Sequence, residues 1–157
     1  VVHDPTRAET VTAVRGAGAR LNGEPIHVSA TASLDRALLA TGFPYDMRRT
    51  RRDNLTQFAA FAKLAQGIRR GGSASLDLCY VACGRLDGYW EEKLQPWDVA
   101  AGALMVEEAG GRVTGYFGEA FDPRARHLVG SNGRFHDAMV ELLGGLESTA
   151  GLPPVGR

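Results

Sequence analysis

The sequence carries no excess of charge of either sign, because 18 Lys and Arg residues balance 18 Asp and Glu residues. Proteins that bind nucleic acids or membrane surfaces by general electrostatic attraction carry a basic excess, so this balance argues against both kinds of partner. No apolar run approaches the roughly 20 residues that a membrane-spanning helix needs. The first residues also lack the basic start and apolar run of a signal peptide. The sequence therefore predicts no membrane partner and disfavours nucleic acid.

Cysteine is scarce as well. The two cysteines, Cys79 and Cys83, have a spacing that places them on one face of a helix. They form neither a CxxC motif nor a group with nearby His, so the sequence gives little support to a redox or metal role. We expect two buried, reduced thiols and a cytoplasmic location.

What the sequence does contain is typical of a globular α/β protein. Its 157 residues are 44% hydrophobic and 23% charged, which is ordinary for a soluble domain. Apolar residues at helical spacing, such as Leu55, Phe58 and Phe61, alternate along the chain with short strand-like runs. The predicted strands cover residues 1–3, 10–15, 26–28, 37–42, 68–69, 87–91, 112–114 and 127–129, and the predicted helices residues 54–66, 73–83, 97–109 and 135–143. This alternation predicts a layered α/β fold with a central sheet flanked by helices.

The first 30 residues differ from the rest. Residues 1–3 and 10–15 predict a β-hairpin, whose strands need antiparallel partners that the sequence does not obviously supply. We therefore divide the chain into residues 1–30, with this hairpin and a further strand, an α/β domain over residues 31–147, and a tail over residues 148–157. The two prolines of the tail favour disorder or an extension.

Asp98 is a candidate for chemistry. Pro96 fixes the entry to the helix predicted over residues 97–109, so Asp98 falls in its first turn. A carboxylate there stabilises the helix by about 0.3–1 kcal/mol, through unpaired N–H groups and the helix dipole. An Asp that is ionised at neutral pH is equally suited to hold a hard cation. The residues alone leave both interpretations open.

The segment around Asp98 resembles a known family. Residues 97–102, Trp-Asp-Val-Ala-Ala-Gly, match the second signature of the inositol monophosphatase family, W-D-x-A-A-G. Further blocks match in the correct order, so the similarity covers about residues 1–143 and is far more specific than a lone Trp-Asp pair. Residues 107–113 resemble the family's EAGG-x-V helix ending, residues 67–74 its GIR-x-x-G-[ST]-A segment, residues 87–91 its D-[GA]-Y-[YW]-E strand, residues 3–23 the preceding strand and turn, and residues 41–45 the form found in bacterial members.

This resemblance implies the layered αβαβα fold of sugar phosphatases, with the hairpin belonging to a sheet of the family's first half. It implies Mg²⁺-dependent hydrolysis of a small polyol phosphate, with inositol 1-phosphate as the leading substrate, and a homodimer. Asp98 is then a ligand of the catalytic Mg²⁺, and Glu91 hydrogen-bonds substrate hydroxyls. Gly72, Ser73 and Ala74 line the sugar side at a helix N-terminus. The structural alternatives are a solvated strand end for Glu91, a turn glycine for Gly72 and a helix N-cap for Ser73.

The resemblance does not extend to the rest of the family's metal site. Family members carry a glutamate pair and a D-P-x-D-G-T motif in their first half, and these 157 residues contain neither. Residues 4–7, Asp-Pro-Thr-Arg, lack the second Asp and the Gly-Thr of that motif. We interpret the chain as a fragment of a longer enzyme, rather than a truncated relative. Because one aspartate cannot hold the metal ions that the reaction needs, we expect no appreciable phosphatase activity from the chain alone.

Other functions stay open at this level. Histidinol-phosphate, fructose-1,6-bisphosphate and NADP phosphatases share the same signature. Some bacterial relatives associate with the transcription machinery, and a basic run at Arg48, Arg49, Arg51 and Arg52 could contact phosphates. Such runs in loops are usually just solvated. A third alternative is an inactive relative that only dimerises.

Overall fold

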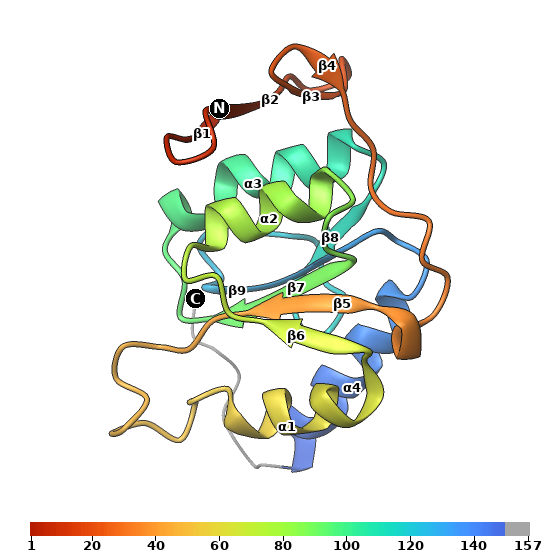
Figure 1. Cartoon of the computed structure of the whole chain (residues 1–157). Helices are drawn as coiled ribbons and strands as arrows, with labels where there is room; N and C mark the ends of the chain where they lie inside the picture. Colours follow the sequence, from red (N-terminus) through yellow and green to blue (C-terminus); the bar gives the residue numbers. More distant parts are fainter. Residues whose placement is uncertain (150–157) are drawn as a thin grey trace.

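The computed structural model describes residues 1–149 of the chain, and side chains as far as Leu146. These residues stack in four layers (Figure 1). An antiparallel sheet lies over the helices α2 (Ala74–Ala82) and α3 (Pro96–Glu108), which cover one face of a mixed sheet. The helices α1 (Leu55–Leu64) and α4 (His136–Thr149) cover its other face. The predicted layered α/β fold with a flanked central sheet is confirmed.

The antiparallel sheet is built entirely from the start of the chain. It contains β1 (Val2–Asp4), β2 (Glu9–Ala13), β3 (Ala19–Leu21) and β4 (Glu24–Pro25), hydrogen-bonded in that order. The predicted hairpin is confirmed, while β3 and β4 provide antiparallel partners that the sequence analysis did not find. The strand predicted over residues 26–28 is not found at that place: β4 ends at Pro25, although the amide of Ile26 still donates to the carbonyl of Ala19 in β3 at 3.0 Å. The chain then leaves the sheet, and the amide of Val28 donates to the carbonyl of Ala109, at the end of α3.

The turn at residues 4–7 is structural. The Asp4 carboxylate accepts hydrogen bonds from the amide of Thr6 at 2.9 Å and from its hydroxyl at 2.6 Å. It also accepts one from the hydroxyl of Tyr80 on α2, at 3.1 Å. The Thr6 hydroxyl is the main reason that the pKa of Asp4 is lowered. Asp4 therefore fixes β1 to α2, and the structure uses it for stability.

The mixed sheet has the order β6-β5-β7-β9-β8. Its members are β5 (Leu38–Thr41), β6 (Gly67–Arg69), β7 (Gly88–Glu92), β8 (Arg112–Thr114) and β9 (His127–Ser131). β5 runs parallel to β6 and β7, whereas β9 runs antiparallel to β7 and β8. The three parallel strands therefore end at one edge of the sheet. In α/β sheets this is the edge at which ligands bind.

Two hydrophobic clusters form the core, one on each face of the mixed sheet. Successive residues of β7 point to opposite faces, as they must in a strand, so Tyr89 joins the first cluster and Trp90 the second. Both side chains have no exposed surface. In the first cluster α2 and α3 pack closely, because a Cβ on Gly102 would lie 2.6 Å from the Cβ of Leu78. The absence of a side chain at Gly102 permits this contact.

The remaining sequence predictions hold in part. The helices and the other strands are found within a few residues of the predicted bounds. A short 3-10 helix, η1 (Leu34–Arg36), precedes β5. Helix α4 is longer than predicted and includes the first two residues of the predicted tail; the rest of that tail lies outside the described residues. The division at residues 30 and 147 stays a prediction.

The expectation of two buried thiols holds for Cys79 and only in part for Cys83. Both thiols are free, with Cys79 buried and Cys83 half-buried. Burial raises the pKa of Cys79 to about 12, so it stays a neutral thiol, 3.3 Å from the sulfur of Met105. Within residues 1–149, every helix is too short or too polar to span a bilayer.

Candidate active site

A pocket of about 400 Å³ opens where the three parallel strands end. Its walls come from the segment after β5, the turn between β6 and α2, the end of β7, the first turn of α3 and the residue before β9. All five site residues predicted from the sequence line it: Asp98, Glu91, Gly72, Ser73 and Ala74. The fold therefore brings together two blocks of the sequence that are about 20 residues apart.

Asp98 lies half-buried in the first turn of α3. One carboxylate oxygen, Oδ2, accepts a hydrogen bond from the amide of Gln95 at 2.9 Å. This contact fixes the side chain against the start of the helix, which is the structural role that the sequence allowed. Asp98 forms no ion pair with a basic residue of the described chain, and it lines the pocket. Its second oxygen is thus available to a ligand from the pocket side.

Glu91 lies on β7 and is also half-buried. The hydroxyl of Tyr89, two residues earlier on the same face of the strand, donates a short hydrogen bond to its Oε2. A Cβ on Gly42 would overlap the Glu91 carboxylate, so the carboxylate covers the backbone where β5 ends. Burial raises the pKa of Glu91, and the hydrogen bond from Tyr89 opposes this effect. Glu91 therefore forms part of the pocket wall, and the hydrogen bond from Tyr89 holds its side chain in place.

The turn before α2 forms another wall. Gly72 has a φ of +93°, a left-handed conformation that glycine adopts without strain. Ser73 occupies the N-cap position of α2, as predicted, but its hydroxyl bonds no backbone amide of the helix. It lies 3.2 Å from the Ser75 hydroxyl instead. With Ala74 as the first helical residue, the unpaired N–H groups of α2 face the pocket, where they suit an electronegative ligand.

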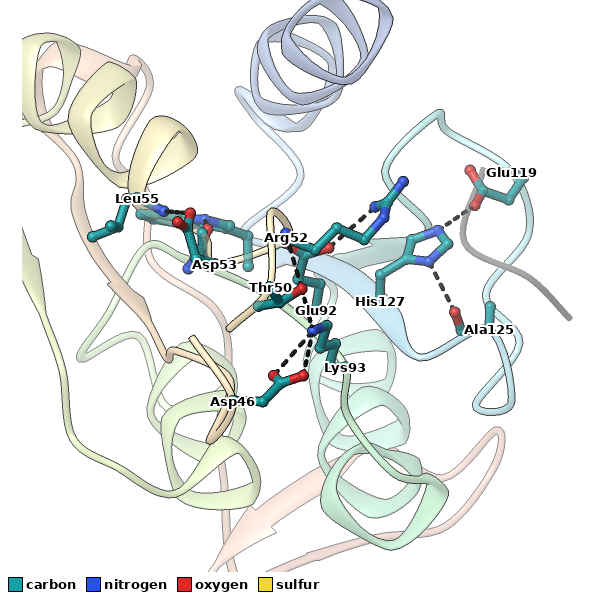
Figure 2. Close-up of polar contacts among 12 residues, drawn as sticks. Asp46, Thr50, Arg52, Asp53, Leu55, Glu92, Lys93, Glu119, Ala125 and His127 are labelled. Atoms are coloured by element: carbon teal, nitrogen blue, oxygen red, sulfur yellow. Dashed lines mark hydrogen bonds and ion pairs between the residues drawn. The ribbon is translucent and has the colours of Figure 1, made fainter. Parts of the chain in front are cut away.

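Basic residues stand beside the acids. Lys93, with a φ of +62°, follows β7, and Arg126, with a φ of +64°, precedes β9; both line the pocket. Lys93 donates to both carboxylate oxygens of Asp46 at 2.9 Å and to the hydroxyl of Thr50 at 2.8 Å (Figure 2). The Lys93 hydrogen bond is the main reason that the pKa of Asp46 is lowered. These contacts fasten the segment after β5 to the end of β7.

The basic run of residues 48–52 does not act as one unit. The Nη1 of Arg52 lies 3.2 Å from Oε2 of Glu92, which is buried at the end of β7 (Figure 2). Arg48, Arg49 and Arg51 are exposed. Arg52 is thus part of the attachment between this segment and the sheet, and three arginines of the run face solvent.

The metal site predicted from the resemblance is incomplete in this chain. Within the described residues, no three His, Cys, Asp or Glu side chains converge closely enough to hold a metal ion. Asp98 nevertheless suits one ligand position, because a carboxylate oxygen is of the type that Mg²⁺ prefers and this one faces the pocket. The donor set fits a magnesium site to which this chain contributes one carboxylate.

The comparisons with known proteins agree with this arrangement. The sequence profile of the inositol monophosphatase family matches residues 1–147. The chain belongs to this family. It is 48% identical over 143 residues to "Inositol-1-monophosphatase" of Synechocystis, an alignment that covers 91% of the chain and 50% of the relative. It is also 48% identical over 142 residues to "Nus factor SuhB" of Pseudomonas aeruginosa, covering 89% of the chain and 52% of the relative.

Solved structures of the family show the same fold. An inositol monophosphatase from Anabaena superposes with a TM-score of 0.89 at 43% identity, over 99% of this chain and 59% of that one. The inositol monophosphatase of Thermotoga maritima gives a TM-score of 0.84 at 36% identity, over 95% and 56%. The chain thus spans about half the length of the family members it matches.

Among the pocket residues that the sequence did not single out are the charged residues Arg70, Asp77, Lys93 and Arg126. Lys93 and Arg126 lie in loops of no recognisable pattern, and only the fold brings them together. Asp77 did leave a signal. It is the one charged residue in the otherwise apolar or small-residue helix α2, four residues after Ser73, and hence on the same side of the helix as its N-cap.

Proposed function

We propose that this chain forms part of a Mg²⁺-dependent phosphatase that hydrolyses the phosphate monoester of a small polyol. The single observation that carries the proposal is the meeting of Asp98 and Glu91 in one pocket at the carboxyl ends of the parallel strands. Membership of the inositol monophosphatase family supports it. Inositol 1-phosphate is the leading substrate, with histidinol phosphate, fructose 1,6-bisphosphate and NADP as alternatives. A homodimer, and a cytoplasmic location in keeping with two free thiols, belong to the same proposal.

Each pocket residue has a distinct task in this proposal. Asp98 would hold Mg²⁺ through the oxygen that Gln95 does not occupy. Bound Mg²⁺ supplies a water nucleophile near neutral pH and neutralises the charge that develops on the phosphate and the leaving oxygen. Glu91, held by Tyr89, accepts hydrogen bonds from polyol hydroxyls. The N–H groups at the start of α2 orient the substrate, and the exposed Arg126 adds a positive charge at the pocket wall that favours an anion.

The proposal is tested by assaying the full-length gene product with Mg²⁺ against the four substrates named above. We expect turnover of at least one of them, with the highest kcat/KM for inositol 1-phosphate. The chain of residues 1–157 assayed in parallel should be inactive, because its described residues do not complete a metal site. Absence of phosphate release from every substrate by the full-length product would refute the proposal.

The sharpest prediction concerns Asp98. Asp98→Asn should lower kcat at least about 10³-fold, because the amide is a poor metal ligand; this corresponds to about 4 kcal/mol of transition-state stabilisation. The amide oxygen can still accept the bond from Gln95, so the fold should be retained. Asp137→Asn is the matched control, since Asp137 is likewise an acid in the first turn of a helix but lies outside the pocket. A kcat for Asp98→Asn within tenfold of wild type would exclude Asp98 as a metal ligand.

A second candidate function is a role as a Nus factor. It is favoured by the 48% identity to a relative of that name, and by the exposure of Arg48, Arg49 and Arg51 beside the pocket segment. The two functions separate experimentally, because only hydrolysis requires Asp98. Asp98→Asn in the full-length gene should abolish any cellular effect that depends on hydrolysis. If the effect persists in Asp98→Asn and disappears when the three arginines become alanine, the second function is favoured.

A further inference from the structure

Asp77 is a buried acid that the tasks described above do not use. It lies in α2 and lines the same pocket as Glu91, yet only 4% of its surface is exposed. A Cβ on Gly71 would lie 2.5 Å from its Oδ1, so the carboxyl group fills the space beneath the turn that leads into the helix. The absence of a side chain at Gly71 is what admits an acid here.

This carboxyl group makes no hydrogen bond or ion pair with any other described residue, whereas the backbone amide of Asp77 donates to the carbonyl of Ser73 as part of the helix. Arg70 and Glu91 are the charged groups that act on it, and their effects oppose each other. Burial is the main reason that the pKa of Asp77 is raised to about 7; the charge of Glu91 adds to the shift, and Arg70 reduces it. The carboxyl oxygens are not fully enclosed, because Asp77 lines the pocket, so a ligand in the pocket can supply the partner that the fold does not.

A purely structural role would give the carboxyl group a partner within the fold, as happens for another buried acid of this chain. Asp87, 7% exposed, accepts hydrogen bonds from the hydroxyl of Ser29 at 2.5 Å and from the amide of Leu38 at 2.6 Å. Asp77 has equal burial and no such contacts. Its carboxyl oxygens therefore remain available to a ligand in the pocket that Glu91 also lines.

We propose that Asp77 is a further substrate-binding residue, whose carboxyl group hydrogen-bonds a hydroxyl of the polyol at the inner wall of the pocket. The proposal rests on the function proposed above and adds to it a residue that selects substrates rich in hydroxyls. A carboxyl group can donate and accept when protonated and accept when ionised, so it satisfies a hydroxyl in either state. Glu91 and Asp77 would then bind different hydroxyls, since Tyr89 already occupies one oxygen of Glu91.

The test compares two phosphate esters in the full-length gene product. Inositol 1-phosphate carries hydroxyls and p-nitrophenyl phosphate does not. Asp77→Leu, similar in shape but unable to hydrogen-bond, should raise KM for inositol 1-phosphate about tenfold, while kcat stays within about twofold. Asp77→Asn, which keeps a donor and an acceptor, should restore KM to within about threefold. For p-nitrophenyl phosphate, both variants should keep kcat/KM within about twofold.

Two results would overturn the proposal: an equal loss with both esters, which would mean a structural role, or an unchanged KM for inositol 1-phosphate in Asp77→Leu. Should that variant not fold, the wild-type protein answers the question by NMR. The carbon-13 resonance of the Asp77 carboxyl, assigned by its loss in Asp77→Asn, should move when inositol 1-phosphate is added and stay in place with inorganic phosphate. No movement with either also refutes the proposal.

Failure of this inference is distinguishable from failure of the proposed function. If the full-length product hydrolyses neither ester, the proposed function fails, whereas the carboxyl resonance still reports whether Asp77 meets a polyol. If it hydrolyses both esters and Asp77→Leu leaves their ratio unchanged, phosphatase function stands and the assignment of Asp77 falls.

Discussion

The two edges of the mixed sheet differ in whether the fold provides hydrogen-bond donors for a buried acid. At the edge where β5 and β7 begin, both oxygens of Asp87 have hydrogen-bond donors, from Ser29 and from Leu38. At the edge where these strands end, Asp77 lacks any such donor among residues 1–149, although it is equally buried. The first edge uses its polar groups to hold the fold together, and the second leaves them to face a pocket. Satisfied and unsatisfied acids thus separate structural residues from candidate functional ones.

The network at the first edge extends beyond Asp87. The side-chain amide of Asn132 donates to the hydroxyl of Ser29 at 2.9 Å and to the carbonyl of Thr31 at 2.8 Å. Its backbone amide donates to the carbonyl of Asp87 at 3.0 Å. These contacts connect the loop before η1 to the start of β7 and the end of β9. Every polar group of this network has a partner inside the fold, as buried polar groups need.

The largest stability effect should come from breaking this network. Asp87→Ala leaves the amide of Leu38 and the hydroxyl of Ser29 without an acceptor, so we expect the free energy of unfolding to fall by about 3 kcal/mol. Urea denaturation of the purified protein measures it. Asp35→Ala, in the nearby η1, is the control and should change the unfolding free energy by less than about 0.5 kcal/mol. Equal effects of the two substitutions would show that the edge network does not hold the fold.

At the pocket edge, removal of the buried acid should raise the free energy of unfolding instead of lowering it. The pKa of Asp77 is about 7 in the folded chain against 3.8 for a free Asp, so ionisation opposes folding. The cost is absent below about pH 4, grows as the pH rises, and is complete above about pH 7. The full shift corresponds to about 4 kcal/mol, and water in the pocket should reduce this to about 2 kcal/mol.

Asp77→Asn should therefore be more stable than wild type by about 2 kcal/mol at pH 8 and nearly equal to it at pH 4. Urea denaturation at the two pH values measures the difference. Asp77→Leu, which also lacks the charge but cannot hydrogen-bond, should gain stability at pH 8 while it raises KM for inositol 1-phosphate, which would mark the wild-type acid as a functional residue kept at a cost in stability. Lower stability of Asp77→Asn at pH 8 would place Asp77 in the same class as Asp87, and the contrast between the edges would disappear.

Most of the fold could be predicted from the sequence, because the pattern of apolar residues fixes which segments become strands and helices. This pattern did not predict β3 and β4, because both strands are too short and too polar to show the alternation of apolar and polar residues that marks a strand. The pattern also misplaced the strand of residues 26–28: β4 ends at Pro25, Ile26 keeps one backbone hydrogen bond to β3, and Val28 bonds to the end of α3. In both places long-range contacts, which a local pattern does not contain, decide the outcome.

The candidate site divides in the same way. Asp98 and Glu91 lie in motifs that can be recognised, and the fold brings them to one pocket. Lys93 and Arg126 are about 30 residues apart in loops, and they line the same pocket only because β7 and β9 are neighbours in the sheet. Asp77 was predictable as an unusual acid in an apolar helix, but its missing partner becomes visible only when its surroundings are known.

The smallest expected effect on the free energy of unfolding concerns a histidine at the first edge, which has both ring nitrogens hydrogen-bonded. It tests whether such a group still responds to pH. His136, at the start of α4, has no exposed surface. One ring nitrogen lies 2.9 Å from the Thr114 hydroxyl and the other 2.8 Å from that of Ser131, the residue paired with Gly88 where β7 begins. Burial lowers the pKa of His136 to about 4; the charge of Arg112 adds to this, and Asp137 opposes it. The folded chain therefore holds a neutral ring where the unfolded chain, with a pKa of 6.5, becomes protonated.

Because the unfolded state binds the proton more tightly, stability should fall as the pH drops below 6.5, and the loss should be complete near pH 4. We expect about 1 kcal/mol between pH 7 and pH 5, after allowing for screening. Over the same range Asp77 acts in the opposite direction, since its protonation removes a buried charge, and the two effects partly cancel in the wild type. The effect of His136 should thus appear in full in Asp77→Asn and disappear in Asp77→Asn combined with His136→Gln. If the combined variant still loses as much stability on acidification as Asp77→Asn does, a group other than His136 titrates over this range.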